Sequence, residues 1–490
     1  MLNNYLKKTD FNSYEDFYNN FKVDVPKYFN FAYDIVEQYA KIEPDKIAMV
    51  WCDDKGNDAI FTFKEIDNYA NKVANFFASL GITKGDPVML ILKRRYEFWF
   101  SIIALHKIGA VAIPATHLLT KKDIIYRNNA ASVKMIVSVP DNEVIENIEN
   151  AKADSPTLKH VVSIGKGKDG IIDFYQGIEK QSDKFTKPAY IDKLTESDLM
   201  LLYFTSGTTG MPKMVAHNFK YPLGHIITAK YWQNVQDNGL HLTVADTGWA
   251  KAAWGKIYGQ WICGCAVFVY DYDKFVPKNL LTVLSKYKVT SFCAPPTIYR
   301  YIIKENLKEF DLTKLKHCSI AGEPLNPEVY NQFLSLTGLK LIEGYGQTEL
   351  TLSVGTFPWI EPKPGSMGKP SPYYDIDIVN EDRSSCEVGE VGQIVLRTDK
   401  IRPLGMFNGY YRDAELTNKV WNGNIYFTGD TAWKDEDGYL WFVGRTDDII
   451  KSSGYRIGPF EVESALLEHP AVLECAVTGV PDPDRGQVVK

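Results

Sequence analysis

Helical and extended patterns alternate along the chain up to about residue 365, and this alternation limits the fold more than any other feature. Thr62 and Glu65 have the spacing of a capping box, apolar side chains then recur at helical spacing over 63–80, and Gly81 follows. The alternation continues with a strand, a helix and a strand at 87–92, 96–108 and 110–114. Regular alternation of this kind predicts an α/β fold with open, mostly parallel sheets.

The pattern changes after about residue 365. Short alternating strands, among them 375–379 and 393–397, are separated by Gly- and Asp-rich turns, which predicts a small barrel-like lobe over about 365–440. A polar stretch at 444–456 then precedes a helix expected over 459–468. The stretch 444–456 is therefore our candidate domain boundary. Further strands are expected before the change, at 161–164, 199–204, 266–270, 291–294 and 317–321.

Composition narrows the class of protein and its partners. The 490 residues are 45% hydrophobic and 24% charged, with a formal net charge of −6, so bulk charge does not favour nucleic acid. The longest apolar run, 261–270, is about half the length that a bilayer span needs, and the N-terminus lacks the apolar core of a signal peptide. We expect no nucleic-acid partner, no membrane span and a cytoplasmic location. The seven scattered cysteines are expected to be free thiols in a reducing compartment.

A glycine-rich segment, YFTSGTTGMPK at 203–213, carries the strongest chemical signal. An apolar strand leads into a loop in which small residues let backbone N–H groups converge on phosphate oxygens. Hydroxyl groups add donors and Lys213 adds positive charge. This is not a Walker A loop, because G-x-x-x-x-G-K-[ST] is absent. A merely flexible turn would not require the strand, the hydroxyl groups, the glycines and Pro-Lys to coincide.

Two other segments also contain closely spaced glycines. GKGKDG at 165–170 satisfies G-x-G-x-x-G, but 171–175 reads as extended rather than helical, so we expect a surface hairpin and not a dinucleotide site. In LIEGYGQTE at 341–349, Tyr345 could stack on a base, and Thr348 and Glu349 are hard oxygen donors suited to Mg²⁺ near phosphates. Considered alone, this second segment could also be a structured loop.

Four motifs in order resemble the signatures of the acyl-adenylate-forming superfamily: YFTSGTTGMPK (203–213), GYGQTE (344–349), YFTGD (426–430) and GRTDDIIKSSGYRIGPFEVE (444–463). ADTGW (245–249), IRPLG (401–405) and PDPDRG (481–486) make the chain most similar to medium-chain acyl-CoA synthetases, a branch that includes enzymes for short, branched and aromatic acids. The resemblance implies a large domain of two α/β lobes and a barrel-like lobe (1–446). The hinge and start of a small mobile α+β domain, truncated here, would follow (447–490).

The activity that the resemblance implies has two half-reactions. A small-molecule carboxylic acid attacks the α-phosphorus of ATP, and coenzyme A then takes the acyl group from the adenylate, with Mg²⁺ as the cofactor. Oligomeric state is left open, with a homodimer as one candidate. Two alternatives remain: a carrier-protein-loading adenylation domain, and a nucleotide-binding relative with weak activity. The first usually carries Phe-Asp-x-Ser where this chain has ADTGW.

The resemblance also assigns the nucleotide site. The loop would embrace the β- and γ-phosphates, through Thr205, Ser206, Gly207, Thr208, Thr209, Gly210 and Lys213. Adenine would be sandwiched by Gly322, Glu323, Pro324 and Tyr345. ATP would also be bound by Glu343, Gly344, Gly346 and Gln347. Asp430, unless it is only a turn residue, would accept both ribose hydroxyls, and Arg445 would support ribose or phosphate. The catalytic residues would be Lys213, Thr348 at the α-phosphate or acyl carboxylate, and Glu349, which with Thr205 would bind Mg²⁺.

Coenzyme A and the acid are assigned to other segments. Asp447 would be the hinge; Ser453, Gly454 and Tyr455 would line the pantetheine tunnel; and Arg456 and Arg485 would face phosphates, with a solvated surface role open for Arg485. Trp249, Lys251 and Trp254 would form the acyl pocket, although such a helical stripe with Tyr258 could equally be core. Lys251 could steer the carboxylate or extend to solvent. His217, His225 and His241 have no convincing partners by spacing, so we expect them to be structural.

One family element has no match. The family carries a lysine near its C-terminus, in a Gly-Lys context, that reaches the α-phosphate, and nothing after Tyr455 matches it. The end at Lys490 inside an apolar run favours a fragment over a natural truncation. We therefore expect this chain to bind ATP and acid but to adenylate weakly. Addition of the missing segment should restore turnover, and a normal rate of pyrophosphate release without it would contradict this expectation.

Overall fold

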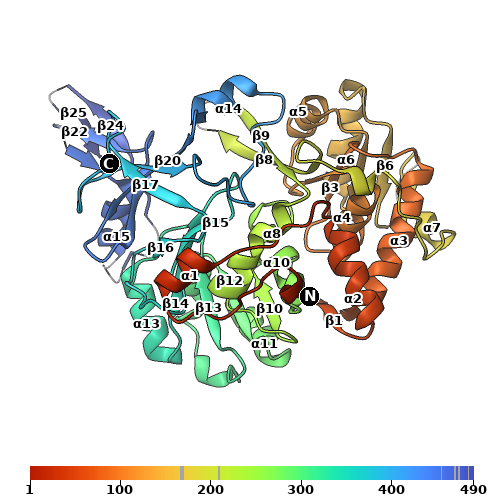
Figure 1. Ribbon diagram of the computed structural model, residues 1–490, viewed down its shortest axis with the longest axis horizontal. Helices are drawn as coiled ribbons and strands as arrows, with labels where there is room; N and C mark the ends of the chain where they lie inside the picture. The colour runs from red at the N-terminus through yellow and green to blue at the C-terminus, as the bar shows by residue number, and fades with distance from the viewer. Residues whose placement is uncertain are drawn as a thin grey trace.

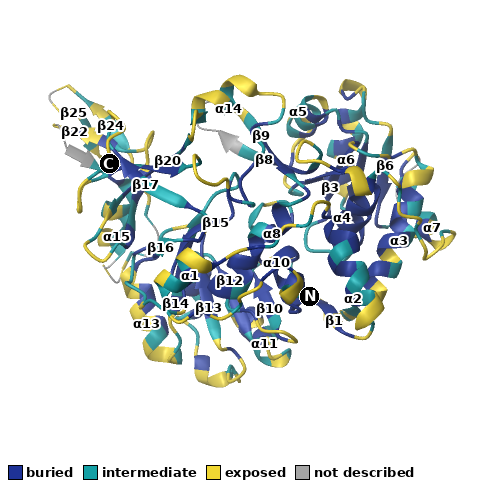
Figure 2. Ribbon diagram, viewed as in Figure 1, coloured by how far each residue is buried: buried dark blue, intermediate teal, exposed yellow. Residues whose placement is uncertain are grey.

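The computed structural model describes residues 1–165, 170–207, 210–453, 455–467, 469, 471–472, 475–483 and 485–490, with the backbone alone for residues 206, 207, 455 and 456. Two large sheets lie side by side and carry helices on their faces, and two smaller sheets follow toward the C-terminus (Figure 1). Most strands of the two large sheets are buried (Figure 2). The predicted α/β class is confirmed.

The nine-stranded sheet is parallel from β14 to β1, and its edges β2, β15 and β16 are antiparallel. Its strands in spatial order are β16 (Lys369–Pro370), β15 (Leu352–Gly355), β14 (Leu341–Gly346), β13 (His317–Ile320), β12 (Ser291–Ala294), β10 (Leu240–Thr243), β11 (Ala266–Asp271), β1 (Ile47–Asp53) and β2 (Asp58–Thr62). Parallel strands buried on both faces explain the continuous apolar runs in the sequence.

The seven-stranded sheet is parallel except for its last pair. Its order is β7 (Ile172–Asp173), β6 (His160–Ser163), β5 (Met135–Ser138), β3 (Pro87–Ile91), β4 (Val111–Pro114), β8 (Leu199–Gly207) and β9 (Gly210–Asn218). The glycine-rich segment is thus the tip of the antiparallel β8–β9 hairpin, in which Thr205 faces Lys213. Residues 208 and 209 lie outside the described part.

The helices that cover and connect these sheets include those predicted over 63–80, 96–108 and 459–468. They are α1 (Tyr14–Asn20), α2 (Glu37–Ile42), α3 (Phe63–Ser79), α4 (Glu97–Ile108), α5 (Lys121–Ala131), α6 (Asn142–Ala151), α7 (Phe174–Glu179), α8 (Tyr221–Ile226), α9 (Lys251–Gly255), α10 (Tyr258–Ile262), α11 (Pro277–Lys286), α12 (Pro296–Ile302), α13 (Pro327–Thr337), α14 (Ala414–Val420) and α15 (Pro459–Leu467). Short 3₁₀ or π turns are η1 (Leu2–Asn4), η2 (Ala32–Val36), η3 (Lys152–Asp154), η4 (Ile191–Lys193), η5 (Ile227–Trp232) and η6 (Leu307–Glu309). None of the helices within the described ranges has the length and hydropathy to cross a bilayer.

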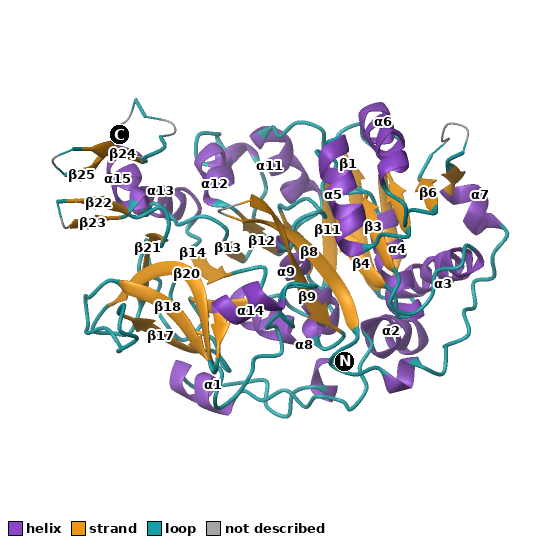
Figure 3. Cartoon of the chain, turned by 90° about the horizontal axis from the view of Figure 1, so that it is seen from above, coloured by secondary structure: helices purple, strands orange, loops and turns teal. Residues whose placement is uncertain are grey.

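The third sheet is antiparallel, as predicted for the lobe after residue 365. Its order is β17 (Asp375–Val379), β18 (Gly392–Arg397), β20 (Ile425–Lys434) and β19 (Trp421–Asn422), with β21 (Leu440–Arg445) also on β20. The last sheet has the order β23 (Tyr455–Ile457), β22 (Ile450–Ser452), β25 (Gly486–Val489) and β24 (Gly479–Asp482). Figure 3 shows it with α15 at the opposite end of the molecule from β6 and α7. The domain boundary at residues 446 and 447 stays a prediction.

The expected hairpin around residues 165–170 is wrong. Residues 166–169 lie outside the described part, but β6 and β7 on either side of them pair in parallel, which a tight hairpin cannot produce. The expected extended run 171–175 is also shorter than predicted. It ends at Asp173, whose side chain accepts a hydrogen bond from the backbone N–H of Gln176 and caps α7. A strong N-cap stops the strand after two residues.

Candidate active site

A cavity of about 1290 Å³ opens where four parallel strands end. The segments that follow β10, β12, β13 and β14 form one wall, and the β8–β9 hairpin, β20 and β21 form the others. The carboxyl edge of a parallel sheet is the usual place for a ligand in such folds. The cavity brings together these predicted residues: Thr205, Lys213, Trp249, Lys251, Trp254, Gly322, Glu323, Pro324, Glu343, Gly344, Tyr345, Gly346, Gln347, Thr348, Glu349, Asp430, Arg445 and Asp447.

Asp430 is the centre of a hydrogen-bond network in this cavity. Its Oδ2 accepts from the Tyr345 hydroxyl and from Nε2 of Gln347, each at 2.6 Å, and its Oδ1 lies 3.9 Å from Nε of Arg445. Tyr426 completes the network by donating to Oε1 of Gln347 at 2.9 Å. Burial raises the pKa of Asp430, while the hydrogen bond from Tyr345 opposes that rise. An anchored carboxylate of this kind can accept hydrogen bonds from paired hydroxyl groups.

Glu349 lies opposite, on the turn after β14. The Tyr410 hydroxyl donates to its Oε1 at 2.7 Å, and the backbone N–H of Phe407 donates to its carbonyl at 2.8 Å. Burial raises the pKa of Glu349, and the hydrogen bond from Tyr410 and the charge of Lys213 favour the ionised form. Among the other described residues, only Tyr410 donates a hydrogen bond to this carboxylate. A carboxylate with so few donors can also accept a cation.

Glu343 is a second buried carboxyl group on β14. Its Oε1 accepts from the backbone N–H of Leu325 at 3.2 Å, whereas Oε2 is buried with no partner in the described part of the chain. Burial raises the pKa of Glu343 to about 8. The group is consequently protonated at neutral pH and can act as a hydrogen-bond donor toward the cavity.

The other end of the cavity is apolar. A Cβ atom on Gly346 would lie 2.5 Å from the Trp254 ring, and one on Gly344 would lie 2.6 Å from the Trp232 ring, so both rings pack on glycine backbone. Trp254 is 6% exposed. Trp249, at the mouth, is 58% exposed. The predicted wall thus consists of one buried and one open tryptophan.

Lys251 lies between this apolar end and the Gly322 segment. Its ammonium group donates to the carbonyl of Ala321, and burial lowers its pKa. Tyr258, which the sequence groups with these residues, belongs to the core, where His106 hydrogen-bonds to its hydroxyl at 3.0 Å.

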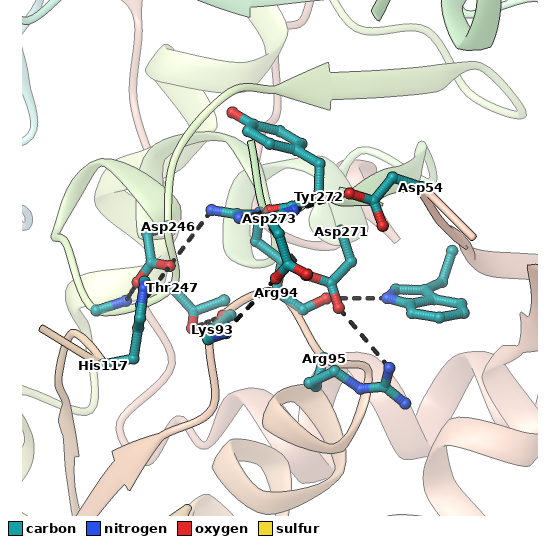
Figure 4. A network of polar contacts seen from close by, with 12 residues as sticks. Asp54, Lys93, Arg94, Arg95, His117, Asp246, Thr247, Asp271, Tyr272 and Asp273 are labelled. Carbon is teal, nitrogen blue, oxygen red and sulfur yellow. Dashed lines mark hydrogen bonds and ion pairs between the residues drawn. The ribbon is translucent and has the colours of Figure 1, made fainter. Parts of the chain in front are cut away.

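A charged network holds the turn that presents Trp249 (Figure 4). Arg94, which follows β3, lies 3.4 Å from Asp246 and 3.8 Å from Asp271 and donates to the carbonyl of Tyr272. Asp246 also accepts from the backbone N–H of Gly248, and the Thr247 hydroxyl donates to the carbonyl of Lys93. The network therefore links the seven-stranded sheet to the turn between β10 and α9.

The predicted coenzyme A residues lie elsewhere. The backbone N–H of Ser453 donates to the carbonyl of Arg485 at 2.9 Å, so these two segments are adjacent, but the described cavity lining includes neither residue. Gly454 lies outside the described residues, and Tyr455 and Arg456 are described only as backbone of β23. In the phosphate loop, Gly210 is exposed and does not line the cavity, Thr208 and Thr209 lie outside the description, and Ser206 and Gly207 are backbone of β8.

Two tyrosines were missed by the sequence analysis. Tyr410 and Tyr426 hold Glu349 and Gln347, and both line the cavity. Tyr426 opens the YFTGD motif, so its place beside Asp430 was a usable signal. Tyr410 has no local signal, because its contact with Glu349 spans 61 residues. No cluster of three or more His, Cys, Asp or Glu side chains suited to a metal occurs in the described ranges.

Comparison with known proteins identifies the family of the chain. The profile of the AMP-binding enzyme family matches residues 36–411, and that of the AMP-binding enzyme C-terminal domain matches 461–490. The chain is 40% identical over 488 residues to the mitochondrial acyl-coenzyme A synthetase ACSM3 of Rattus norvegicus, covering 98% of this chain and 83% of the relative. It is 40% identical over 474 residues to the mitochondrial acyl-coenzyme A synthetase ACSM4 of the same species, covering 95% and 81%.

Solved structures show the same likeness. The anthranilate CoA ligase AuaEII in complex with anthranoyl-AMP has a TM-score of 0.87 at 29% identity and covers 95% of this chain and 87% of its own. An acyl-CoA synthetase of Brucella canis has a TM-score of 0.81 at 29% identity, covering 98% and 88%. The chain therefore belongs to the AMP-binding enzyme family within the acyl-adenylate-forming superfamily, and it is an AMP-forming acyl-coenzyme A synthetase.

Proposed function

We propose that this synthetase activates short or branched monocarboxylic acids in preference to medium-chain and aromatic acids. The observation that carries the proposal is the packing of Trp254 on Gly346 at the apolar end of the cavity. Trp232 stands edge-on to Trp254 at 6.2 Å between ring centroids, so a second aromatic layer lies behind the first. We expect an acyl chain that enters beside Gly346 to meet the Trp254 ring, which Trp232 supports from behind.

The polar groups fit the other substrates. We propose that Asp430 binds the ribose hydroxyls, that Tyr345 and the Gly322–Pro324 segment enclose adenine, and that Lys213 lies at the phosphates. Gly322 has φ +106°, a backbone conformation that residues other than glycine rarely adopt. Without a side chain there, the backbone can approach a flat base. These positions agree with the assignments that the sequence motifs imply.

Mg²⁺ is the cofactor that the superfamily implies, and two residues fit it. Glu349 has a half-buried carboxylate that lines the cavity, and Thr205, which carries a hydroxyl group, lines the same cavity. Hard oxygen donors of this type suit Mg²⁺. When bound, the ion would neutralise phosphate charge during the displacement.

The residues of the chain would contribute positioning and charge. The carboxylate of the acid attacks the α-phosphorus, and pyrophosphate leaves; the thiol of coenzyme A then attacks the acyl carbon, and AMP leaves. We propose that Thr348 orients the attacking carboxylate or the α-phosphate, and that Lys213 balances negative charge on the departing pyrophosphate. Trp254, with Trp232 behind it, would limit how far the acid enters the apolar end of the cavity.

A panel of acids tests the proposal. Thioester formation should be measured with acetate, propionate, isobutyrate, 2-methylbutyrate, hexanoate, octanoate and benzoate under one set of conditions. We expect kcat/KM to be highest among acids of about three to five carbons and to fall at least tenfold by octanoate. A preference for octanoate or benzoate would contradict the proposal.

A matched pair of variants tests the role of the buried ring. Trp254→Ala should shift the preference toward hexanoate and octanoate, because it removes the ring that packs on Gly346. Trp249→Ala, which removes a ring of the same type from the exposed mouth, should leave the chain-length preference unchanged. If both variants keep the same preference as the parent protein, Trp254 does not limit chain length.

A further inference from the structure

A buried histidine connects the phosphate-binding hairpin with the turn that carries Thr348. His217 lies on β9, four residues after Lys213, and its side chain is fully buried. Its Nε2 is 2.8 Å from the backbone carbonyl of Thr348. Because a carbonyl can only accept, Nε2 carries the proton and donates. The ring packs on Tyr221 with 3.9 Å between centroids, so its orientation is fixed.

The protonation state of His217 is simple. Burial lowers its pKa to about 3, so the ring is neutral under physiological conditions. Nδ1 is buried and has no hydrogen-bond partner in the described part of the chain. A neutral ring with its one proton on Nε2 is a directional donor to a single acceptor, and it brings no charge into the site.

The turn that receives this hydrogen bond lies outside the strand ladder. Residues 347–350 follow β14, and the only backbone hydrogen bond recorded within this turn joins the N–H of Leu350 to the carbonyl of Gln347. Glu349 is held from the 407–410 segment, which itself pairs with β9 through Ala216. The contact from His217 is the direct link between β9 and Thr348 in the described residues.

We propose that His217 is a positioning residue for adenylate formation. By holding the carbonyl of Thr348 it fixes the turn on which Thr348 and Glu349 face the substrates, at a set distance from Lys213 on the same strand. This rests on the proposed roles of Thr348 and Glu349. A buried polar ring with one donor and one fixed acceptor sets geometry, and small misplacements of reacting groups are costly in rate.

The test uses the different reach of amide side chains. Glutamine can place its amide N–H near the Nε2 position of histidine, whereas asparagine is too short, and methionine fills the space without a donor. We expect His217→Asn and His217→Met to lower kcat for acid-dependent pyrophosphate release about tenfold to a hundredfold. His217→Gln should recover most of the rate, and the KM for ATP should change less than twofold or so in all three.

His225 provides a matched control. It is also fully buried, burial also lowers its pKa to about 3, and it packs on the same Tyr221 at 4.6 Å, but neither ring nitrogen has a partner in the described residues. His225→Gln and His225→Met should therefore keep kcat while changing the melting temperature as much as the His217 variants do. Equal losses of kcat in the His217 and His225 series would show a packing effect and overturn the proposal.

A double-mutant cycle locates the effect. Because His217 positions both Thr348 and Glu349, His217→Met should lower kcat less in a Thr348→Ala background than in the parent protein. Full additivity of the two losses would overturn the proposal, as would equal rates for His217→Gln and His217→Met in folded protein. If His217→Asn does not fold, the comparison of kcat between His217→Gln and His217→Met still tests the proposal. Failure of the parent protein to release pyrophosphate with any acid would instead refute the proposed function.

Discussion

Single residues at this site are tuned by burial more than by ion pairing. Glu343 shows this most clearly. Among the described residues its carboxyl group accepts one hydrogen bond, from the backbone N–H of Leu325, and burial raises its pKa to about 8. Asp430 is also buried and Glu349 is half-buried, but each accepts a hydrogen bond from a hydroxyl group that favours the charged form. One cavity thus holds a neutral carboxyl group on β14 and two carboxylates that can meet hydroxyl groups and a cation.

The pH dependence of stability follows from Glu343. Its pKa is higher in the folded than in the unfolded chain, so the folded state binds the extra proton between about pH 4.5 and pH 8. The contribution of Glu343 to the free energy of unfolding is fully present below about pH 4.5 and is lost as the pH rises through about 8. We expect Glu343→Gln to flatten this loss, so that the stability difference between parent and variant changes by about 1.4 kcal/mol per pH unit at most.

Denaturant unfolding measured from about pH 5 to pH 8 checks this expectation. Glu436→Gln, on an exposed turn, is the control and should keep the pH profile of the parent protein. Parallel profiles for the parent protein and Glu343→Gln would show that Glu343 titrates normally. The variant should retain ATP binding, because glutamine can still accept from Leu325 and donate into the cavity.

At the scale of the elements, the sequence predicts the fold well where local patterns decide it. The Thr62–Glu65 capping box is present in both directions and starts α3 where expected. Most strand ends lie within one or two residues of their predicted places, since apolar runs in parallel sheets end at turn residues. The hairpin at 165–170 failed because pairing direction depends on where β7 returns, which no local pattern encodes.

The same limit applies to the site. The motif residues of the nucleotide pocket are readable because each sits in a short distinctive segment. The hydrogen bond from His217 to Thr348 spans 131 residues, and that from Tyr410 to Glu349 spans 61, so neither leaves a pattern in the sequence. A histidine without a partner by sequence spacing, such as His217, can therefore still hydrogen-bond to a distant turn of the site.

The turn between β10 and α9 gives a prediction for an element. Arg94 reaches it from the other sheet and contacts Asp246 and Asp271 (Figure 4). Arg94→Met should release the turn, raise the KM for the acid about tenfold and leave the KM for ATP near its parent value. The KM for the acid of Arg94→Lys should lie between those of the parent protein and Arg94→Met, because the ammonium group of lysine cannot make the paired contacts of a guanidinium group.

Arg95 is the matched control for this prediction. It also contacts Asp271, at 3.8 Å, and pairs with Glu97 at 3.5 Å, but among the described residues it forms no ion pair or hydrogen bond with the turn. Arg95→Met should lower the melting temperature while leaving the KM for the acid unchanged. Steady-state kinetics with varied acid and fixed ATP distinguish the two variants, and an equal rise in KM for both would show a general loosening between the sheets.

At the scale of the whole molecule, the first residues of the chain belong to its core. The N-terminal segment crosses the face of the nine-stranded sheet (Figure 1), and α1 lies against residues more than 300 positions away. Phe17 is fully buried, and its ring is 4.6 Å from Tyr231, 5.1 Å from Phe357 and 4.9 Å from Trp359. The N-terminal segment therefore joins η5 to the residues that follow β15.

Phe17→Ala tests whether this segment holds the large domain together. Removal of a buried phenylalanine costs about 3–5 kcal/mol, and here the loss should fall on the aromatic cluster that joins α1 to η5 and to residues 357–359. We expect the melting temperature of the large domain to drop by several degrees, whereas Tyr28→Ala, at a ring 40% exposed, should have little effect. Because Phe357 and Trp359 of the cluster follow β15, limited proteolysis of Phe17→Ala should cleave first near residues 357–374. Cleavage confined to the first residues of the chain, with an unchanged melting temperature, would show that α1 only rests on the surface.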